Sequence, residues 1–444
     1  MSKRVVVALG AAMVMMAGSA VAQAPVPLSL REAVTRAAEQ TVGVQVAGAE
    51  VDAAAARVGE ARGALLPQLS ASAMDLNRTF NLNAMGITLP TAPGEAPLPA
   101  LVGPFANVDA RVQLNQTLFD PSAYLRMKTA KVAVTGSTAQ ESAAREAAAV
   151  KAAMTYLGVV RARSVLTARH ADAALAAELL DLAQTQLQSG VSTAIDVTRA
   201  RTQKVAADGA ALVAQNAFEQ SQIELARSLG ESPSTRYELT DSLSAESLVG
   251  AIPLNADSLI SLAMTHRPEL KVAAAAGDVA RAMKRSIQAE RLPRVGLFAD
   301  YGASGLHPGD AIATRQLGVQ VSIPLLDGFR REARLEEQSV VQRQAGLRAD
   351  DIREQVRAEV ASALLDLRSG QQQSAIAAER LQLAEDELGQ ARERFSNGVA
   401  GNIEIINAQA SLNHARDAEI DARYTIATAQ AALARAAGVA AGIR

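Results

Sequence analysis

The chain of 444 residues has a formal net charge of −2, no cysteine and only 3% aromatic residues, while 49% of its residues are hydrophobic. Such a balanced charge differs from the broadly basic surface of nucleic-acid-binding proteins, so no nucleic-acid partner is expected. The absence of cysteine excludes disulfides and thiolate metal sites. So few large side chains favour thin, closely packed helices over one large spherical core.

Residues 1–22 have the pattern of a secretory signal peptide. Lys3 and Arg4 precede an apolar stretch over 5–16, and residues 20–22 read Ala-Val-Ala, a small-x-small cleavage pattern. A buried N-terminal helix is the alternative interpretation. No other apolar run reaches the roughly 18 residues that a membrane helix needs, so entry into a membrane would require strands.

The rest of the chain predicts helix, strand, strand and a long helical hairpin, and then the same order again. The first repeat, 23–254, is expected to contain a helix, strands over about 68–80 and 108–119, and a helical hairpin over 122–230. The second repeat, 255–444, is expected to contain a helix, strands over about 294–302 and 315–324, and a hairpin over 328–438. Gly190 and Gly398 lie at matching positions of the two repeats, as do Gly230 and Gly438, which indicates an internal duplication.

Proline placement defines the two hairpins. Prolines are missing between 122 and 232 and from 325 onwards, and a proline inside a helix costs about 3 kcal/mol. Each stretch contains one glycine-bearing turn signal, over 188–193 and over 395–401. The arm before each turn is about 68 residues long, or roughly 100 Å, and helices of that length need coiled-coil partners.

Alternation of apolar and polar residues predicts the strands. The apolar positions of the clearest two are Val108, Ala110, Val112 and Leu114, and then Leu317, Val319, Val321 and Ile323. The intervening positions are strongly polar, which favours a water-filled space on that side. Four strands from one chain cannot close a barrel, and a sheet edge cannot face lipid. The strands must therefore either pack on other parts of a soluble protein or join copies from other chains.

Several short motifs, in this duplicated order, carry a resemblance to a known family. They are Leu66-Pro67 and Leu292-Pro293, Leu118-Phe119-Asp120, the junction 321–328, and Arg267-Pro268-Glu269-Leu270. The mature chain resembles the TolC-like outer-membrane efflux proteins along essentially its whole length. The resemblance implies a mainly α fold with β, in which long α-helical hairpins form a periplasmic α-barrel. Four strands per chain would contribute to a twelve-stranded transmembrane β-barrel in a homotrimer, and an equatorial segment would lie near 231–254 and the C-terminal end.

The same resemblance implies function and partners. The protein would be a passive exit duct in the outer membrane, with a long periplasmic extension, serving a tripartite efflux or type I secretion system. A periplasmic adaptor (membrane fusion) protein and an inner-membrane pump of the RND or ABC type would open it at the helical tips. The alternative is a periplasmic coiled-coil adaptor or scaffold without a pore.

The resemblance also points to the hairpin turns as the entrance. Acidic side chains just after the turns would line it, and the matching residues are Asp196, Glu404 and Asn407. Asn407 replaces an aspartate of the family, and a latching arginine would fall at Ala400, so Arg199 is a substitute donor. Gly190, Val191, Gly398 and Val399 are candidate adaptor contacts. Asp196 has a second interpretation, because Thr193-Ala194-Ile195-Asp196 is a capping-box pattern.

No catalytic, cofactor-binding or metal-binding residues are predicted. The four histidines are scattered without ligand spacing, and no glycine-rich phosphate loop is present. We therefore expect a protein that is not an enzyme and needs no cofactor.

Overall fold

The computed structural model describes residues 26–84, 86, 99–243, 255–397, 399 and 401–442. The expected signal peptide, Gly398 and Ala400 lie outside these residues. The chain forms two compact units, each assembled from segments that are distant in sequence. The first comprises Met1–Ala33, Thr155–Ser244 and Glu379–Tyr424, and the second Val34–Met154, Ala245–Ala378 and Thr425–Arg444. Each unit therefore takes segments from both sequence repeats.

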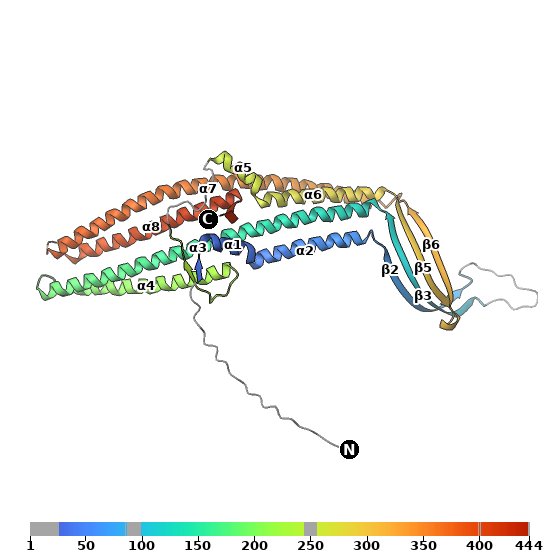
Figure 1. The fold of residues 1–444 in the computed structure, drawn as a ribbon, viewed down its shortest axis with the longest axis horizontal. Coiled ribbons are helices and arrows are strands. Elements are labelled where there is room, and N and C mark those ends of the chain that lie inside the picture. The colour runs from blue at the N-terminus through green and yellow to red at the C-terminus, as the bar shows by residue number, and fades with distance from the viewer. Residues whose placement is uncertain are drawn as a thin grey trace, which may run out of the picture. The chain divides into compact units, whose positions relative to one another are not determined.

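The second unit contains an antiparallel sheet of four strands in the order β2-β3-β5-β6 (Figure 1). Its strands are β2 (Gln68–Asn81), β3 (Leu101–Phe119), β5 (Arg294–Gly305) and β6 (Ile312–Ser322). β3 begins seven residues before the position expected from its alternation. Its first residues pair with the end of β2, with Asn81 opposite Leu101, so ladder hydrogen bonds extend the strand where the alternation does not.

Shorter helices precede the sheet strands, and each predicted opening helix is divided in two. α1 (Leu30–Gln40) and α2 (Val42–Gly63) replace the first, and α5 (Ala256–His266) and α6 (Pro268–Gln288) replace the second. The second break has a clear cause. Arg267 precedes a proline, which disfavours helical geometry, and it has φ −58° and ψ 117°.

Four long helices complete the chain. They are α3 (Pro121–Gln188, 68 residues), α4 (Ala194–Ser228, 35 residues), α7 (Arg330–Ser396, 67 residues) and α8 (Asn402–Ala437, 36 residues). In the second unit Leu259, Val360, Leu364 and Leu433 belong to one core. In the first unit Leu388, Phe395, Ile405 and Leu412 belong to another. Among the described helices, none has a stretch long and apolar enough to cross a membrane.

The first unit also contains a small parallel pair, β1 (Val26–Leu28) with β4 (Tyr237–Leu239), which the sequence did not indicate. Tyr156 of α3 is fully buried against it and donates a hydrogen bond to the carbonyl oxygen of Leu28 at 3.0 Å and to the Asp241 carboxylate at 2.7 Å. Burial and the Asp241 carboxylate raise the pKa of Tyr156. The remaining elements are 3-10 turns at Ala289–Arg291, Pro308–Asp310 and Ala440–Gly442.

Candidate functional site

The strand register gives the sheet one apolar and one polar face. Directly paired residues of antiparallel strands share a face, and one such row runs Leu69–Leu114–Ala299–Leu317 across all four strands. Leu297 pairs with Val319 on the same face. Leu317 and Val319 are 75% and 62% exposed. In a single copy of the chain, these apolar side chains are therefore largely uncovered.

The opposite face is polar and carries charges. A row of Ser70, Gln113, Asp300 and Gln316 crosses the four strands. Arg111 lies on this face, where its Nε donates to Asp109 Oδ1 at 2.7 Å and its Nη1 to Asp300 Oδ1 at 3.2 Å. The two faces of the sheet therefore differ sharply in polarity.

The sheet ends in two open edges. Within the described residues, β2 pairs only with β3, and β6 pairs only with β5. Their outer backbone N–H and C=O groups are therefore available for another strand, and an apolar medium cannot satisfy them.

The turn between α3 and α4 lies in the first unit and exposes its tip. Gly190 has φ +75°, the left-handed conformation that ends many helices. The Val191 N–H donates to the Gln186 carbonyl oxygen at 3.0 Å, while the Val191 side chain is 63% exposed. Val191 thus presents an apolar side chain on an ordered turn.

Asp196 is the acidic half of a capping box at the start of α4. Its carboxylate accepts hydrogen bonds from the Thr193 N–H at 3.1 Å, the Thr193 hydroxyl at 2.5 Å and the Ser192 hydroxyl at 3.2 Å. The Thr193 hydrogen bond is the main reason that the pKa of Asp196 lies below its ordinary value. The local capping geometry therefore fixes the orientation of this carboxylate.

Glu404 occupies a different environment at the start of α8. Its Oε1 lies 3.2 Å from Nε of Arg394, and both side chains are substantially exposed. Asn407 is exposed on the same helix. Arg199 is exposed and lies 3.9 Å from Asp196, its neighbour on α4. Val399 is 71% exposed.

Near the turns, a side chain from each hairpin donates a hydrogen bond to a backbone carbonyl group of the other hairpin. The buried Asn402 donates its amide to the Asp196 carbonyl oxygen at 2.8 Å. Gln186 donates to the Phe395 carbonyl oxygen at 3.0 Å. These hydrogen bonds bring Asp196 and Glu404 to the same end of the first unit, and hold the two turns together.

An ionic cluster around the buried Asp172, missed from the sequence, joins α3 to α8 farther from the turns. Asp172 is 2% exposed and accepts hydrogen bonds from Arg169 at 2.8 Å and from Arg416 at 2.7 Å. Arg169 also pairs with Asp417. The partners on α8 lie over 240 residues from those on α3. One aspartate among many on a helix gives no sign of such a contact in the sequence.

Arg267, from the Arg-Pro-Glu-Leu motif, holds the end of α8 within the second unit. It is 4% exposed, donates to Glu359 at 2.7 Å and also reaches the Arg435 carbonyl oxygen at 3.4 Å. Burial alone would raise the pKa of Glu359, but the Arg267 hydrogen bond and charge hold it below its ordinary value. The motif therefore has a structural role.

These features define a class of protein: an amphipathic sheet with open edges, continued by long helical hairpins. Residues 33–231 and 259–439 match the family described as outer membrane efflux protein. The chain belongs to this family, which places it in the outer membrane with a long helical periplasmic extension.

Curated relatives and solved structures agree with this assignment. The chain is 24% identical to the outer membrane efflux protein BepC of Brucella suis over 334 residues, covering 74% of this chain and 71% of the relative. It is 25% identical to the alkaline protease secretion protein AprF of Pseudomonas aeruginosa over 342 residues, covering 74% and 69%. The CmeC outer membrane channel of Campylobacter jejuni has the same fold, with a TM-score of 0.76, 17% identity and coverage of 93% and 86%.

Proposed function

We propose that the chain is one third of a passive outer-membrane exit duct for efflux or secretion. Three copies would close a twelve-stranded β-barrel around the polar faces of their sheets, and their helices would form a periplasmic α-barrel. The observation that carries this proposal is the pair of open edges on a sheet with an exposed apolar face. In an outer membrane those backbone groups must pair, and strands from identical copies satisfy them.

The proposed entrance is the end of the first unit where the two turns meet. Glu404 would supply negative charge there, with Asp196 held by its cap, Asn407 beside them and Arg199 as a local counter-charge. The exposed Val191 and Val399, with the glycines before them in sequence, Gly190 and Gly398, are proposed contacts for a periplasmic adaptor. Such an adaptor, together with an inner-membrane pump, would open the passive duct at these tips. The pump would supply the energy for transport. Support for these partners comes from AprF, whose name describes protease secretion.

Cross-linking of the sheet edges tests this assembly, because the native chain has no cysteine to react. Ser70→Cys on β2 together with Gln316→Cys on β6, treated with a flexible bis-maleimide in outer membranes, should give covalent dimers and trimers. The matched control pair, Gln113→Cys with Asp300→Cys, lies on adjacent inner strands in the same row and should link only within one chain. Monomers alone from the edge pair would reject the duct and favour a scaffold without a pore.

A further inference from the structure

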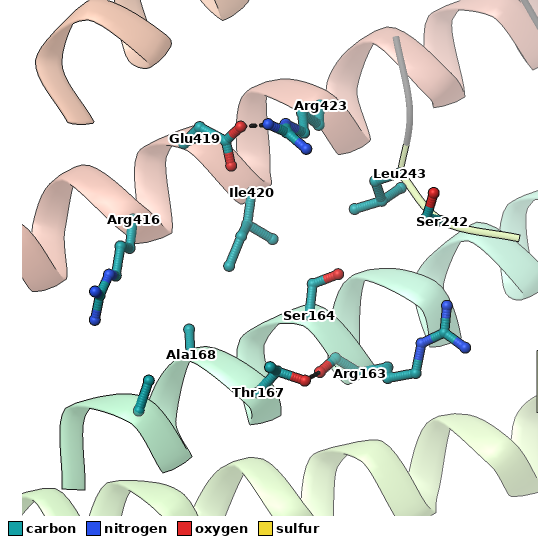
Figure 2. Close-up of a pocket in the computed structure, with 11 residues that line it drawn as sticks. Arg163, Ser164, Thr167, Ala168, Ser242, Leu243, Arg416, Glu419, Ile420 and Arg423 are labelled. Carbon is teal, nitrogen blue, oxygen red and sulfur yellow. Dashed lines mark hydrogen bonds and ion pairs between the residues drawn. The ribbon is translucent and has the colours of Figure 1, made fainter. Parts of the chain in front are cut away.

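The first unit contains a cavity of about 470 Å³ between α3 and α8, lined in addition by Ser242 and Leu243. This volume lies within the range of about 300–1,000 Å³ that is usual for small-molecule sites. In Figure 2, Arg416 and the guanidinium of Arg163 lie at opposite ends, with Ile420, Ala168 and Ser164 between them. The cavity is separate from the hairpin turns proposed above as the entrance.

The middle of the cavity is apolar and offers no free hydroxyl donor. Ile420 and Leu243 are 9% and 6% exposed, and Ala168 also lines the cavity. The hydroxyls of Ser164 and Thr167 each donate at 3.0 Å to a carbonyl oxygen of their own helix. The charged donors of the lining are those of the arginines, and Ser242 adds a neutral hydroxyl.

The arginines leave the cavity with excess positive charge. Arg423 pairs with Glu419, the carboxylate of the lining, and Arg416 pairs with Asp172 at 2.7 Å. Arg163 differs, because it donates to the carbonyl oxygens of Leu239, at 2.6 Å, and of Asp241. No ion pair among the described residues includes Arg163. Two carbonyl groups satisfy two of its five donors but do not neutralise its charge.

We propose that this cavity binds an amphipathic organic anion. Its acidic group would pair with Arg163, a guanidinium held in place by two carbonyl groups, and its apolar body would cover Ile420, Leu243 and Ala168. Hydrogen bonds between a guanidinium and an acidic group are charge-assisted, and they are therefore stronger than those between neutral groups. Because α3 and α8 both line the cavity, the bound anion would also strengthen the contact between these helices.

The probe is 2-naphthoate, a water-soluble anion with an apolar ring system, titrated calorimetrically into the full chain in a nonionic detergent. Its neutral isostere 2-naphthamide is the ligand control. We expect 2-naphthoate to bind with a dissociation constant of about 1 mM or tighter. We expect Arg163→Gln to weaken that binding at least about tenfold. The exposed Arg357, paired with Glu354 on α7, provides the control variant Arg357→Gln, which should bind like the native chain.

Ala168→Leu provides a second test that leaves every charge in place. Its larger side chain would fill the apolar part of the cavity and should also weaken binding at least about tenfold, while helical content and oligomer size remain those of the native chain. This variant decides the question if Arg163→Gln disturbs the β1–β4 region that Arg163 contacts. Equal binding of 2-naphthamide, no binding of 2-naphthoate to the native chain, or unchanged binding by Ala168→Leu would each overturn the proposal.

Discussion

At the scale of single residues, the two acids near the turns differ in how they are held. Asp196 accepts three hydrogen bonds from its own turn, so its ionised form stabilises the start of α4. Because its folded pKa is lowered, that stabilisation is present above the unfolded pKa, near 4, and is lost as the pH falls through the folded pKa. Glu404 contacts the exposed Arg394 and has no comparable cap, so its carboxylate is held less tightly than that of Asp196.

The resulting prediction concerns ion selectivity. Glu404→Ala should lower the preference for cations in single-channel recordings, because a ring of carboxylates at a narrow entrance attracts cations and excludes anions. The control is Asp208→Ala, which removes an exposed acid from the middle of α4. Unchanged selectivity in Glu404→Ala would remove this residue from the proposed entrance.

At the scale of elements, the buried Asp172 cluster fastens α3 to α8. The cluster brings two guanidinium groups to one carboxylate, and Arg169 is shared with Asp417. Loss of the Asp172 carboxylate would take from the partly buried Arg416 its ion-pair partner, whereas Arg169 would keep Asp417. We therefore expect the contact between these two helices to depend strongly on this one side chain.

Replacement of Asp172 by asparagine keeps the shape of the side chain and removes its charge. We predict a loss of about 3 kcal/mol in the free energy of unfolding, measured by denaturation of the detergent-solubilised protein. Asp421→Asn is the matched comparison, because Asp421 also joins α8 to α3, through Arg161 at 2.7 Å, but is 54% exposed. Asp421→Asn should lower the free energy of unfolding by less than about 1 kcal/mol. Equal effects of the two variants would mean that burial of Asp172 does not matter.

At the scale of the whole molecule, the proposed duct requires the amphipathic sheet to meet lipid on one face and water on the other. Val319 and Gln320 are neighbours on β6 that point to opposite faces. A lysine on a lipid-facing position costs about 2–4 kcal/mol at the middle of a membrane, whereas the same change toward water is tolerated.

Paired lysine variants use this difference. Val319→Lys should reduce the amount of assembled protein in outer-membrane fractions, measured as the heat-modifiable species on gels. Gln320→Lys should assemble like the native chain. A reversed result, with Gln320→Lys defective and Val319→Lys normal, would exchange the two faces and contradict the proposed orientation of the sheet.

The sequence alone was sufficient to predict a mainly helical protein with strands and its family, and the comparisons confirm both. These features depend on local rules: missing prolines allow long helices, and alternation of side chains marks strands. The capping interpretation of Asp196 also came from four adjacent residues, and it is the arrangement observed. The internal duplication and the trimer remain predictions.

Other features were decided only by tertiary structure. The β1–β4 pair has three residues in each strand, too few for a periodic pattern, and Tyr156 and Arg163 from a distant helix donate hydrogen bonds to it. The Asp172 cluster and the cavity beside Arg163 likewise require side chains separated by more than 70 residues to come together. Local sequence determines which helices and strands can form. It does not specify which faces of those elements meet, because that depends on packing and charge pairing between segments far apart in the chain.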